Sequence, residues 1–282
     1  METGLAFAGG GIPGSAAVGV LLAFEEAGIK VSHVTGSSSG AMVAALYAYG
    51  HKAETLKRIV PSLNRRLLDF DWRSLFYRAL FIRPRVEGIL KGERLRNIMV
   101  QHTGDEPLSS LKIPCGIVAT DYGRGTSVVF SSNSVGDYEY VNNTSIADAV
   151  RASFAIPVLF KPYHYGERML IDGGVTSNCP VRICRALGAE RVISVDPITP
   201  IINAKSGSAS IVKVINNVIN LSLKTQMEAE HKEADYNLYP EVGAIGAFDF
   251  RKASHCIDLG YETAMAKIEE IKKVLTEQEQ EY

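Results

Sequence analysis

Residues 4–50 read GLAFAGGGIPGSAAVGVLLAFEEAGIKVSHVTGSSSGAMVAALYAYG and follow the order strand, glycine-rich turn and helix twice. The apolar residues 4–8 form the first expected strand, because the glycines after them cannot continue it. Residues 15–27 carry apolar side chains at helical spacing until a glycine stops the helix. Residues 29–34, a second turn and residues 41–49 repeat the order. This alternation predicts a parallel sheet covered by helices, with ligands at the carboxyl ends of its strands.

The same pattern continues to about residue 200. Strand patterns recur at residues 113–119, 128–130 and 191–196, and helical patterns at residues 146–154 and 180–187. Two further amphipathic helices are predicted, at residues 210–227 and 255–275.

We therefore expect one α/β domain over residues 1–282, built as three layers in which helices cover both faces of a mainly parallel sheet. Within it, residues 205–282 are expected to supply flanking helices, and residues 61–102 a cap.

Composition excludes several classes of protein. The chain of 282 residues has 30 Lys or Arg against 31 Asp or Glu, a formal net charge of −1, so a nucleic-acid partner is not expected. Its four cysteines contain no C-x-x-C pair and are too sparse for a disulfide framework. There is no apolar run of about 18 residues and no basic segment before the first apolar stretch, so we expect neither a transmembrane anchor nor a secretory signal. The expected location is the cytoplasm, including the surface of a membrane, although secretion without a cleaved signal would leave no trace in these patterns.

The second turn, Gly36-Ser37-Ser38-Ser39-Gly40, fits the G-x-S-x-G nucleophile elbow and lies where a strand meets a helix. A serine at such a turn is strained and points its hydroxyl at a helix N-terminus, which favours developing negative charge. Ser38 is therefore a candidate nucleophile. The alternative is a turn of small residues with no catalytic task.

The first turn, residues 9–14 (GGGIPG), can be interpreted in two ways. As G-x-G-x-x-G it would bind a dinucleotide in an oxidoreductase, but residues 31–35 supply no acidic residue for a ribose and Pro13 lacks an amide for phosphate. As an oxyanion hole, its consecutive glycine amides would stabilise a tetrahedral intermediate at the neighbouring serine. We favour the second interpretation.

A serine nucleophile needs a base. In the chain order of α/β-hydrolases the base would be His231 or His255, yet both lie in helical patterns rather than in a late loop. Among carboxylates, Asp172 follows a strand-like segment and precedes two glycines, while Asp121 and Asp196 occupy similar strand ends. The residues alone leave these three aspartates as contenders.

These motifs, in this order, resemble those of the patatin-like phospholipases: a glycine-rich oxyanion loop, a G-x-S-x-G elbow and a D-G-[AG] turn. The similarity continues through residues 119–121 (ATD), 151–157 (RASFAIP) and 178–181 (NCPV), and covers about residues 4–197. The resemblance implies a patatin-like α/β fold and an acyl hydrolase that acts on lipids without a metal or other cofactor.

The resemblance also assigns roles within the site. It implies that Ser38 is the nucleophile, that Asp172 is the general base with no histidine between them, and that the amides of Gly10 and Gly11 are the oxyanion donors. It favours Asp172 over the other two aspartates, which then serve as structural or turn residues. The motif-supporting glycines are Gly9, Gly14, Gly36, Gly40, Gly173 and Gly174.

One position departs from the family pattern. The family commonly has Arg or Lys just before the last glycine of the first motif, where this chain has Pro13. A cation there would strengthen binding of a negative oxygen or head group. The alternatives to a hydrolase are therefore a catalytically weak or inactive lipid-binding protein, and an acyltransferase that uses the same serine.

A lipid substrate requires an interface, and residues 65–96 are the candidate. Residues 61–100 contain nine Lys or Arg against four Asp or Glu, interleaved with Phe70, Trp72, Phe76, Tyr77 and Phe81. Aromatic side chains at head-group depth and arginines near anionic lipid would favour peripheral membrane contact. The alternative is a solvated cap whose aromatic residues fill the space above the site.

Overall fold

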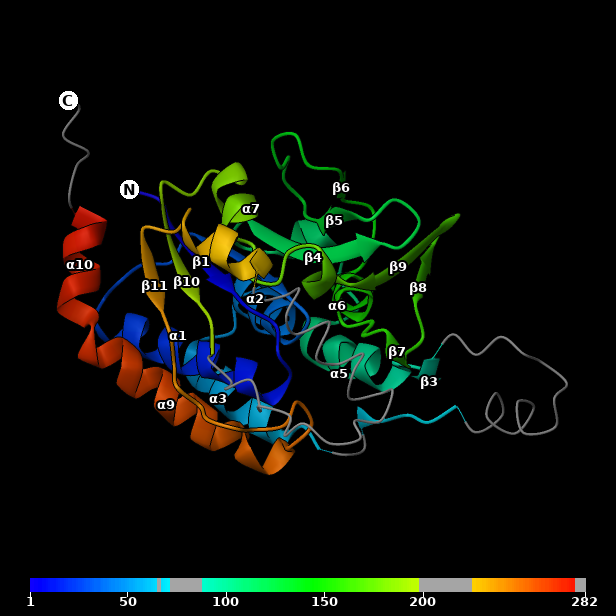
Figure 1. Cartoon of the computed structure of the whole chain (residues 1–282), viewed down its shortest axis with the longest axis horizontal. Coiled ribbons are helices and arrows are strands. Elements are labelled where there is room, and N and C mark those ends of the chain that lie inside the picture. The colour runs from blue at the N-terminus through cyan, green and yellow to red at the C-terminus, as the bar shows by residue number, and fades with distance from the viewer. Residues whose placement is uncertain (65–66, 72–87, 198–224, 277–282) are drawn as a thin grey trace, which may run out of the picture.

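The computed structural model describes residues 1–64, 67–71, 88–197 and 225–276, and a mixed sheet of nine strands runs through this part of the chain (Figure 1). The strands of this sheet are β1 (Thr3–Phe7), β2 (His33–Ser37), β4 (Cys115–Asp121), β5 (Thr126–Phe130), β6 (Tyr140–Val141), β8 (Tyr163–Tyr165), β9 (Arg168–Asp172), β10 (Arg191–Val195) and β11 (Tyr236–Leu238). Strands β3 (Gly88–Leu90) and β7 (Val158–Phe160) form a separate parallel pair.

The main path of the sheet has the order β11-β10-β1-β2-β4-β5-β6. The five strands from β11 to β4 are mutually parallel, as the βα alternation predicts. Strands β5 and β9 pair with β4 in the antiparallel sense, and β8 pairs with β9. The sheet is therefore mainly parallel at its centre and mixed at one side.

Helices cover both faces of the sheet. They are α1 (Ala16–Glu26), α2 (Ser39–Tyr49), α3 (Ala53–Ser62), α5 (Glu93–Thr103), α6 (Ile146–Ser153), α7 (Val181–Ala186), α9 (Ala253–Ala266) and α10 (Ile268–Thr276), with short 3-10 helices η1 (Ile12–Ser15), η3 (Leu108–Ser110), η4 (Gly173–Val175) and η5 (Phe250–Lys252).

The first strand shows how the layers are separated. Leu5 and Phe7 are buried in the larger core with α1 and α2, whereas Ala6 and Ala8 are buried in a smaller core beneath α7. Alternate side chains of a strand point to opposite faces, so a strand that is apolar throughout fits a sheet covered on both sides.

Most expected elements are present, with shifts at their ends. The strand expected at residues 29–34 lies at β2, and residues 35–37, expected as a turn, pair with β1 and β4. Small residues are needed there because α2 folds back on this strand end: a Cβ on Gly36 would lie 2.4 Å from the carbonyl carbon of Gly40.

The C-terminal helix differs from the prediction. The single helix expected at residues 255–275 is two helices, because Lys267 leaves helical geometry (φ −113°, ψ 6°) between α9 and α10. The break lets Ile268, Ile271 and Leu275 on α10 stay buried. Of the helix expected at residues 210–227, residues 225–227 are helical and the rest lies outside the described residues.

The expected cap is described only in part, since Trp72, Phe76, Tyr77 and Phe81 lie outside the described residues. Its described end is held by the buried side chain of Arg151 on α6, which donates hydrogen bonds to the backbone oxygens of Lys91 and Lys161. Within the described ranges, every helix is too short or too polar to cross a bilayer.

Candidate active site

Strand β4 brings two distant strand ends together. Its first half pairs with β2 as far as the partners Ser37 and Val118, and its second half pairs with β9 from the partners Ala119 and Asp172. Strand β5 occupies the other side of this second half, so β2 and β9 must lie on the same side of β4. Because β2 is parallel to β4 and β9 is antiparallel, the carboxyl ends of β2 and β9 meet head to head. The elbow serine and Asp172 are thereby placed beside each other.

Ser38 occupies the strained turn that the motif predicts. Its backbone has φ 53° and ψ −122°, a positive φ that is uncommon for a residue with a side chain, and it is the N-cap of α2. Its N–H donates to Ser153 Oγ at 2.9 Å, which fixes the turn from α6. Gly40 allows this tight crossing, since a Cβ there would lie 2.4 Å from the backbone oxygen of Phe7.

Asp172 ends β9 with its carboxyl group buried. One carboxyl oxygen, Oδ1, accepts a hydrogen bond from Gly174 N–H at 2.8 Å. The other, Oδ2, is buried and makes no hydrogen bond of normal geometry to any described residue. Burial raises the pKa of Asp172 to about 6, and hydrogen bonding from the Ser38 hydroxyl and from Gly174 N–H opposes that rise in pKa. The carboxyl group thus faces Ser38, and its Oδ2 atom can accept a further hydrogen bond.

The turn after Asp172 is as crowded as the elbow. A Cβ on Gly173 would lie 2.0 Å from the backbone oxygen of Val118, and one on Gly174 would lie 3.0 Å from Asp172 Oδ1. Neither glycine can be replaced without moving the aspartate or β4. These contacts give a physical reason for the two glycines of the D-G-G turn.

The first glycine loop lies against the elbow. A Cβ on Gly9 would come within 3.0 Å of Ser38 Cβ, and one on Gly14 within 2.4 Å of Ser39 Oγ. Gly10 (φ 143°) and Gly11 (φ 71°) have positive φ values that favour glycine. Within the described chain, the N–H groups of Gly10 and Gly11 donate to no other group. They therefore remain available to a ligand.

The other candidate acids and bases have different neighbours. Asp121 Oδ1 accepts hydrogen bonds from the N–H groups of Gly123 and Arg124 (2.9 and 3.1 Å), as a turn residue does. Asp196 Oδ2 lies 3.5 Å from His231 Nε2, so its carboxyl group faces that ring. His255 is on the exposed side of α9. Of the three aspartates that the sequence left open, Asp172 is the one that faces Ser38.

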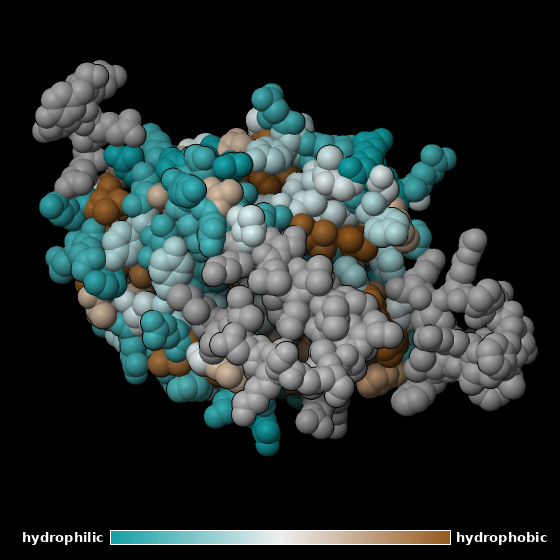
Figure 2. All heavy atoms as spheres, in the orientation of Figure 1, coloured by the Kyte–Doolittle hydropathy of each residue, from teal (hydrophilic) through white to brown (hydrophobic). Residues whose placement is uncertain are grey.

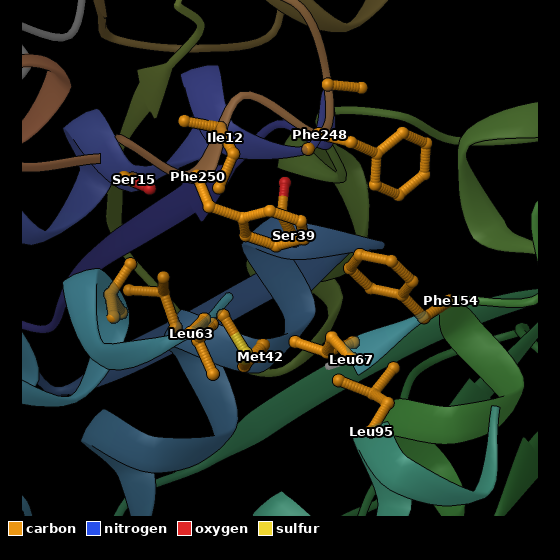
Figure 3. Close-up of a pocket in the computed structure, with 14 residues that line it drawn as sticks. Ile12, Ser15, Ser39, Met42, Leu63, Leu67, Leu95, Phe154, Phe248 and Phe250 are labelled. Atoms are coloured by element: carbon orange, nitrogen blue, oxygen red, sulfur yellow. The ribbon is translucent and has the colours of Figure 1, made fainter. Parts of the chain in front are cut away.

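An apolar pocket adjoins the elbow (Figure 3). It lies between the glycine loop, α2, α3, α5 and residues 247–250, and its wall includes Ile12, Met42, Leu63, Leu95, Phe154 and Phe248. The segment at residues 247–250 is attached to the glycine loop, because Ile12 N–H donates to the backbone oxygen of Ala247 at 3.0 Å. The space beside the elbow is therefore lined mainly by apolar side chains.

Sequence reasoning missed two parts of this site. Ser153, which accepts the Ser38 N–H, lies inside the segment at residues 151–157 and could have been noticed there. Phe248 and Phe250, which line the pocket, come from a stretch with no periodic pattern that would have drawn attention to it. As to metals, the described His, Cys, Asp and Glu residues form no group of three that could hold an ion.

Comparison with known proteins gives consistent matches. The chain is 26% identical over 289 aligned residues to an uncharacterised NTE family protein of Mycobacterium tuberculosis, covering 94% of this chain and 46% of that protein. It is 28% identical to the lysophospholipase NTE1 of Debaryomyces hansenii over 69% of this chain and 12% of that protein. The chain thus spans less than half the length of both relatives.

Among solved structures, VipD from Legionella pneumophila has a similar fold. Its TM-score is 0.58 at 17% sequence identity, covering 95% of this chain and 67% of that chain. The sequence model of the patatin-like phospholipases matches residues 5–185. That segment is more than half of the chain and includes the end of β1, the elbow and β9, so the chain belongs to the patatin-like phospholipase family.

Proposed function

We propose that the chain hydrolyses a carboxylic ester of an acyl lipid through a covalent acyl-serine intermediate, with Ser38 as nucleophile and Asp172 as general base. The observation that carries this proposal is the meeting of two strand ends on β4, which sets the elbow serine against a buried carboxyl group. Membership of the patatin-like phospholipase family supports it.

Each chemical step has a residue to perform it. Ionised Asp172 takes the proton of Ser38 Oγ as that oxygen attacks the ester carbonyl carbon. The resulting oxyanion accepts hydrogen bonds from the N–H groups of Gly10 and Gly11, and it collapses as the alcohol leaves with the proton from Asp172. Asp172 then takes a proton from water as the water oxygen attacks the acyl-serine carbonyl carbon. When the bond to Ser38 Oγ breaks, Asp172 returns that proton to Ser38 Oγ and the carboxylic acid is released. Both glycine N–H groups are unused within the described chain, as this role requires.

The pocket beside the elbow supports a lipid substrate. Its wall is apolar, and transfer of each methylene group of an acyl chain from water is favourable by about 0.8 kcal/mol. The name of the relative NTE1, a lysophospholipase, agrees with such a substrate. We place the acyl chain in this pocket and the leaving alcohol towards solvent.

A lipid surface is the partner we propose for the region around β3 and β7. Phe70, which forms a bridge to Leu90 of β3, is 43% exposed, and Val158 at the start of β7 is 59% exposed. Val158 also has φ 71°, an outlier for a branched residue, and strain of this kind is concentrated at functional sites. The excess of basic residues between residues 61 and 100 suits anionic head groups.

The direct test is labelling by a fluorophosphonate, read by mass spectrometry, together with hydrolysis of a short-chain chromogenic ester. We expect label on Ser38, none in Ser38→Ala, and a loss of kcat/KM of about 10³-fold or more in Ser38→Ala and Asp172→Asn. Asp121→Asn is the matched control, because it changes a strand-end aspartate that only caps a turn, and it should retain activity.

Three results would contradict the proposal. Lipid binding with no label on Ser38 would indicate a binding protein rather than an enzyme. Transfer of the acyl group to an added alcohol in preference to water would indicate an acyltransferase. Undiminished activity in Ser38→Ala would remove the serine from the mechanism.

A further inference from the structure

The hydroxyl of Ser39, next to the proposed nucleophile, has no hydrogen-bond partner among the described residues. Ser39 is only 5% exposed, and its Oγ is buried without a hydrogen bond to any described residue. A buried polar group left without a hydrogen bond is destabilising. Since Ser39 lines the apolar pocket, a ligand oxygen is a natural partner for this hydroxyl.

The hydroxyl is buried just beneath the pocket wall and is directed towards the pocket. Figure 3 shows its oxygen directed into the space between Ile12, Phe248 and Phe250. On its other side the hydroxyl abuts Gly14, where a Cβ would lie only 2.4 Å from Ser39 Oγ. The glycine loop thus leaves just enough room for this serine without bonding to it.

The position of Ser39 places its hydroxyl near the start of the acyl chain in the proposed substrate. Ser39 is the first residue of α2 and directly follows Ser38, and adjacent Cα atoms are about 3.8 Å apart. A hydroxyl this close to the nucleophile lies within reach of the first few carbons of an acyl chain bound to Ser38. The rest of the chain would meet the apolar wall further along.

We propose that Ser39 makes the site selective for acyl chains that carry a hydroxyl or keto oxygen within a few carbons of the ester carbonyl. This inference rests on the proposed function, because it places the acyl chain in the pocket beside Ser38. A chain without such an oxygen still fits the apolar wall but leaves the Ser39 hydroxyl unpaired. Sites built around a buried hydrogen-bonding group discriminate strongly against analogues that lack the matching group.

Binding to the Ser38→Ala variant tests the inference, since this variant should retain intact esters. Calorimetric Kd values would be measured for methyl octanoate and for its 2-, 3- and 4-hydroxy analogues. We expect at least one hydroxy ester to bind about tenfold more tightly than methyl octanoate, equivalent to about 1.4 kcal/mol. In the double variant Ser38→Ala/Ser39→Ala this preference should disappear. Ser110→Ala in place of Ser39→Ala is the control, because the Ser110 hydroxyl donates to Glu106 on the exposed surface.

The outcomes separate this inference from the proposed function. Equal preferences with and without Ser39 would overturn the inference, even if the wild-type protein hydrolyses esters. A Ser39-dependent preference with neither hydrolysis nor labelling of wild-type Ser38 would sustain the inference as a binding specificity and overturn the proposed hydrolase. A lower melting temperature in Ser39→Ala together with unchanged binding would show that the hydroxyl is structural.

Discussion

At the scale of single residues, the role proposed for Asp172 as a general base comes with a cost to stability at neutral pH. Burial raises its pKa to about 6, so the folded protein binds this proton more tightly than the unfolded chain, where the pKa lies near 3.8. The contribution of Asp172 to the free energy of unfolding is therefore greatest below pH 3.8 and is lost as the pH rises towards 6. At neutral pH the carboxyl group is ionised in a buried place, which is the state that a general base requires.

The raised pKa predicts the acid limb of the pH profile. In the proposed mechanism, proton transfer from Ser38 requires Asp172 to be ionised, so kcat/KM should fall about tenfold for each pH unit below about 6. Asp196 provides the control, because burial raises its pKa to about 6 as well, while its neighbour is His231. Measured between about pH 4.5 and about pH 8, the acid limb should persist in Asp196→Asn. Its loss in that variant would assign the limb to Asp196 instead.

The site residues differ in how far sequence could identify them. The order of motifs was enough to select Ser38, because a G-x-S-x-G turn between strand and helix is local in sequence. The residues alone left Asp172, Asp121 and Asp196 as contenders, because each follows a strand, and it was the family resemblance that favoured Asp172. What distinguishes Asp172 is the pairing of β9 with the second half of β4, a contact between residues about fifty positions apart. Ser39 gave no sequence signal of its own, since its lack of a partner depends on Gly14 and on the pocket wall.

At the scale of helices and strands, the local sequence pattern predicted which elements exist better than it predicted how the strands pair. The βα alternation correctly indicated a parallel core, but the antiparallel partners of β4 could not be read from alternation. Strand β9 runs antiparallel to β4 because the β8–β9 hairpin reverses the chain before it pairs with β4. That reversal is what directs the end of β9 towards the end of β2, so the least predictable pairing is the one that assembles the site.

The contact between α1 and α9 provides a prediction at this scale. The two helices touch backbone to backbone: a Cβ on Gly260 would lie 2.0 Å from the backbone oxygen of Ala16, and one on Gly19 would lie 1.9 Å from that of Ile257. Helix propensity favours Ala over Gly by about 1 kcal/mol, so Gly260→Ala would stabilise an isolated helix. In this packing we expect the opposite, a loss of about 1–3 kcal/mol in the free energy of unfolding.

Denaturant unfolding of Gly260→Ala measures this loss. Ser254→Ala is the matched control, since Ser254 is exposed on the same helix and its replacement should leave stability unchanged or slightly raised. Equal stability of Gly260→Ala and the wild type would mean that α9 does not pack on α1 this closely. The contact is of interest because α9 lies beyond residues 5–185, the part matched by the family.

At the scale of the whole molecule, hydrophilic and apolar surfaces are unevenly distributed. On the face shown in Figure 2, most residues over α9 and α10 are hydrophilic, with a few apolar residues among them, and apolar patches are also visible near β3 and β7. Phe70 and Val158 belong to that side. An enzyme that takes acyl chains from a lipid surface must present its pocket to that surface. We therefore expect the side with β3 and β7 to dock on the lipid surface and the side with α9 and α10 to remain in water.

Sedimentation with vesicles tests this orientation. Vesicles of phosphatidylcholine alone would be compared with vesicles that also contain phosphatidylglycerol, and the anionic vesicles should bind more protein because residues 61–100 carry an excess of Lys and Arg. Replacing Phe70 and Val158 together by Ser removes two apolar side chains from the proposed contact. Burial of one such side chain contributes about 1.5–3 kcal/mol, so the partition coefficient should fall at least tenfold even if burial is incomplete.

Tyr140→Ser is the control, because Tyr140 is 41% exposed on β6, at the edge of the main sheet and away from β3 and β7. Equal binding by the double variant and the wild type would favour the alternative in which this region only covers the site.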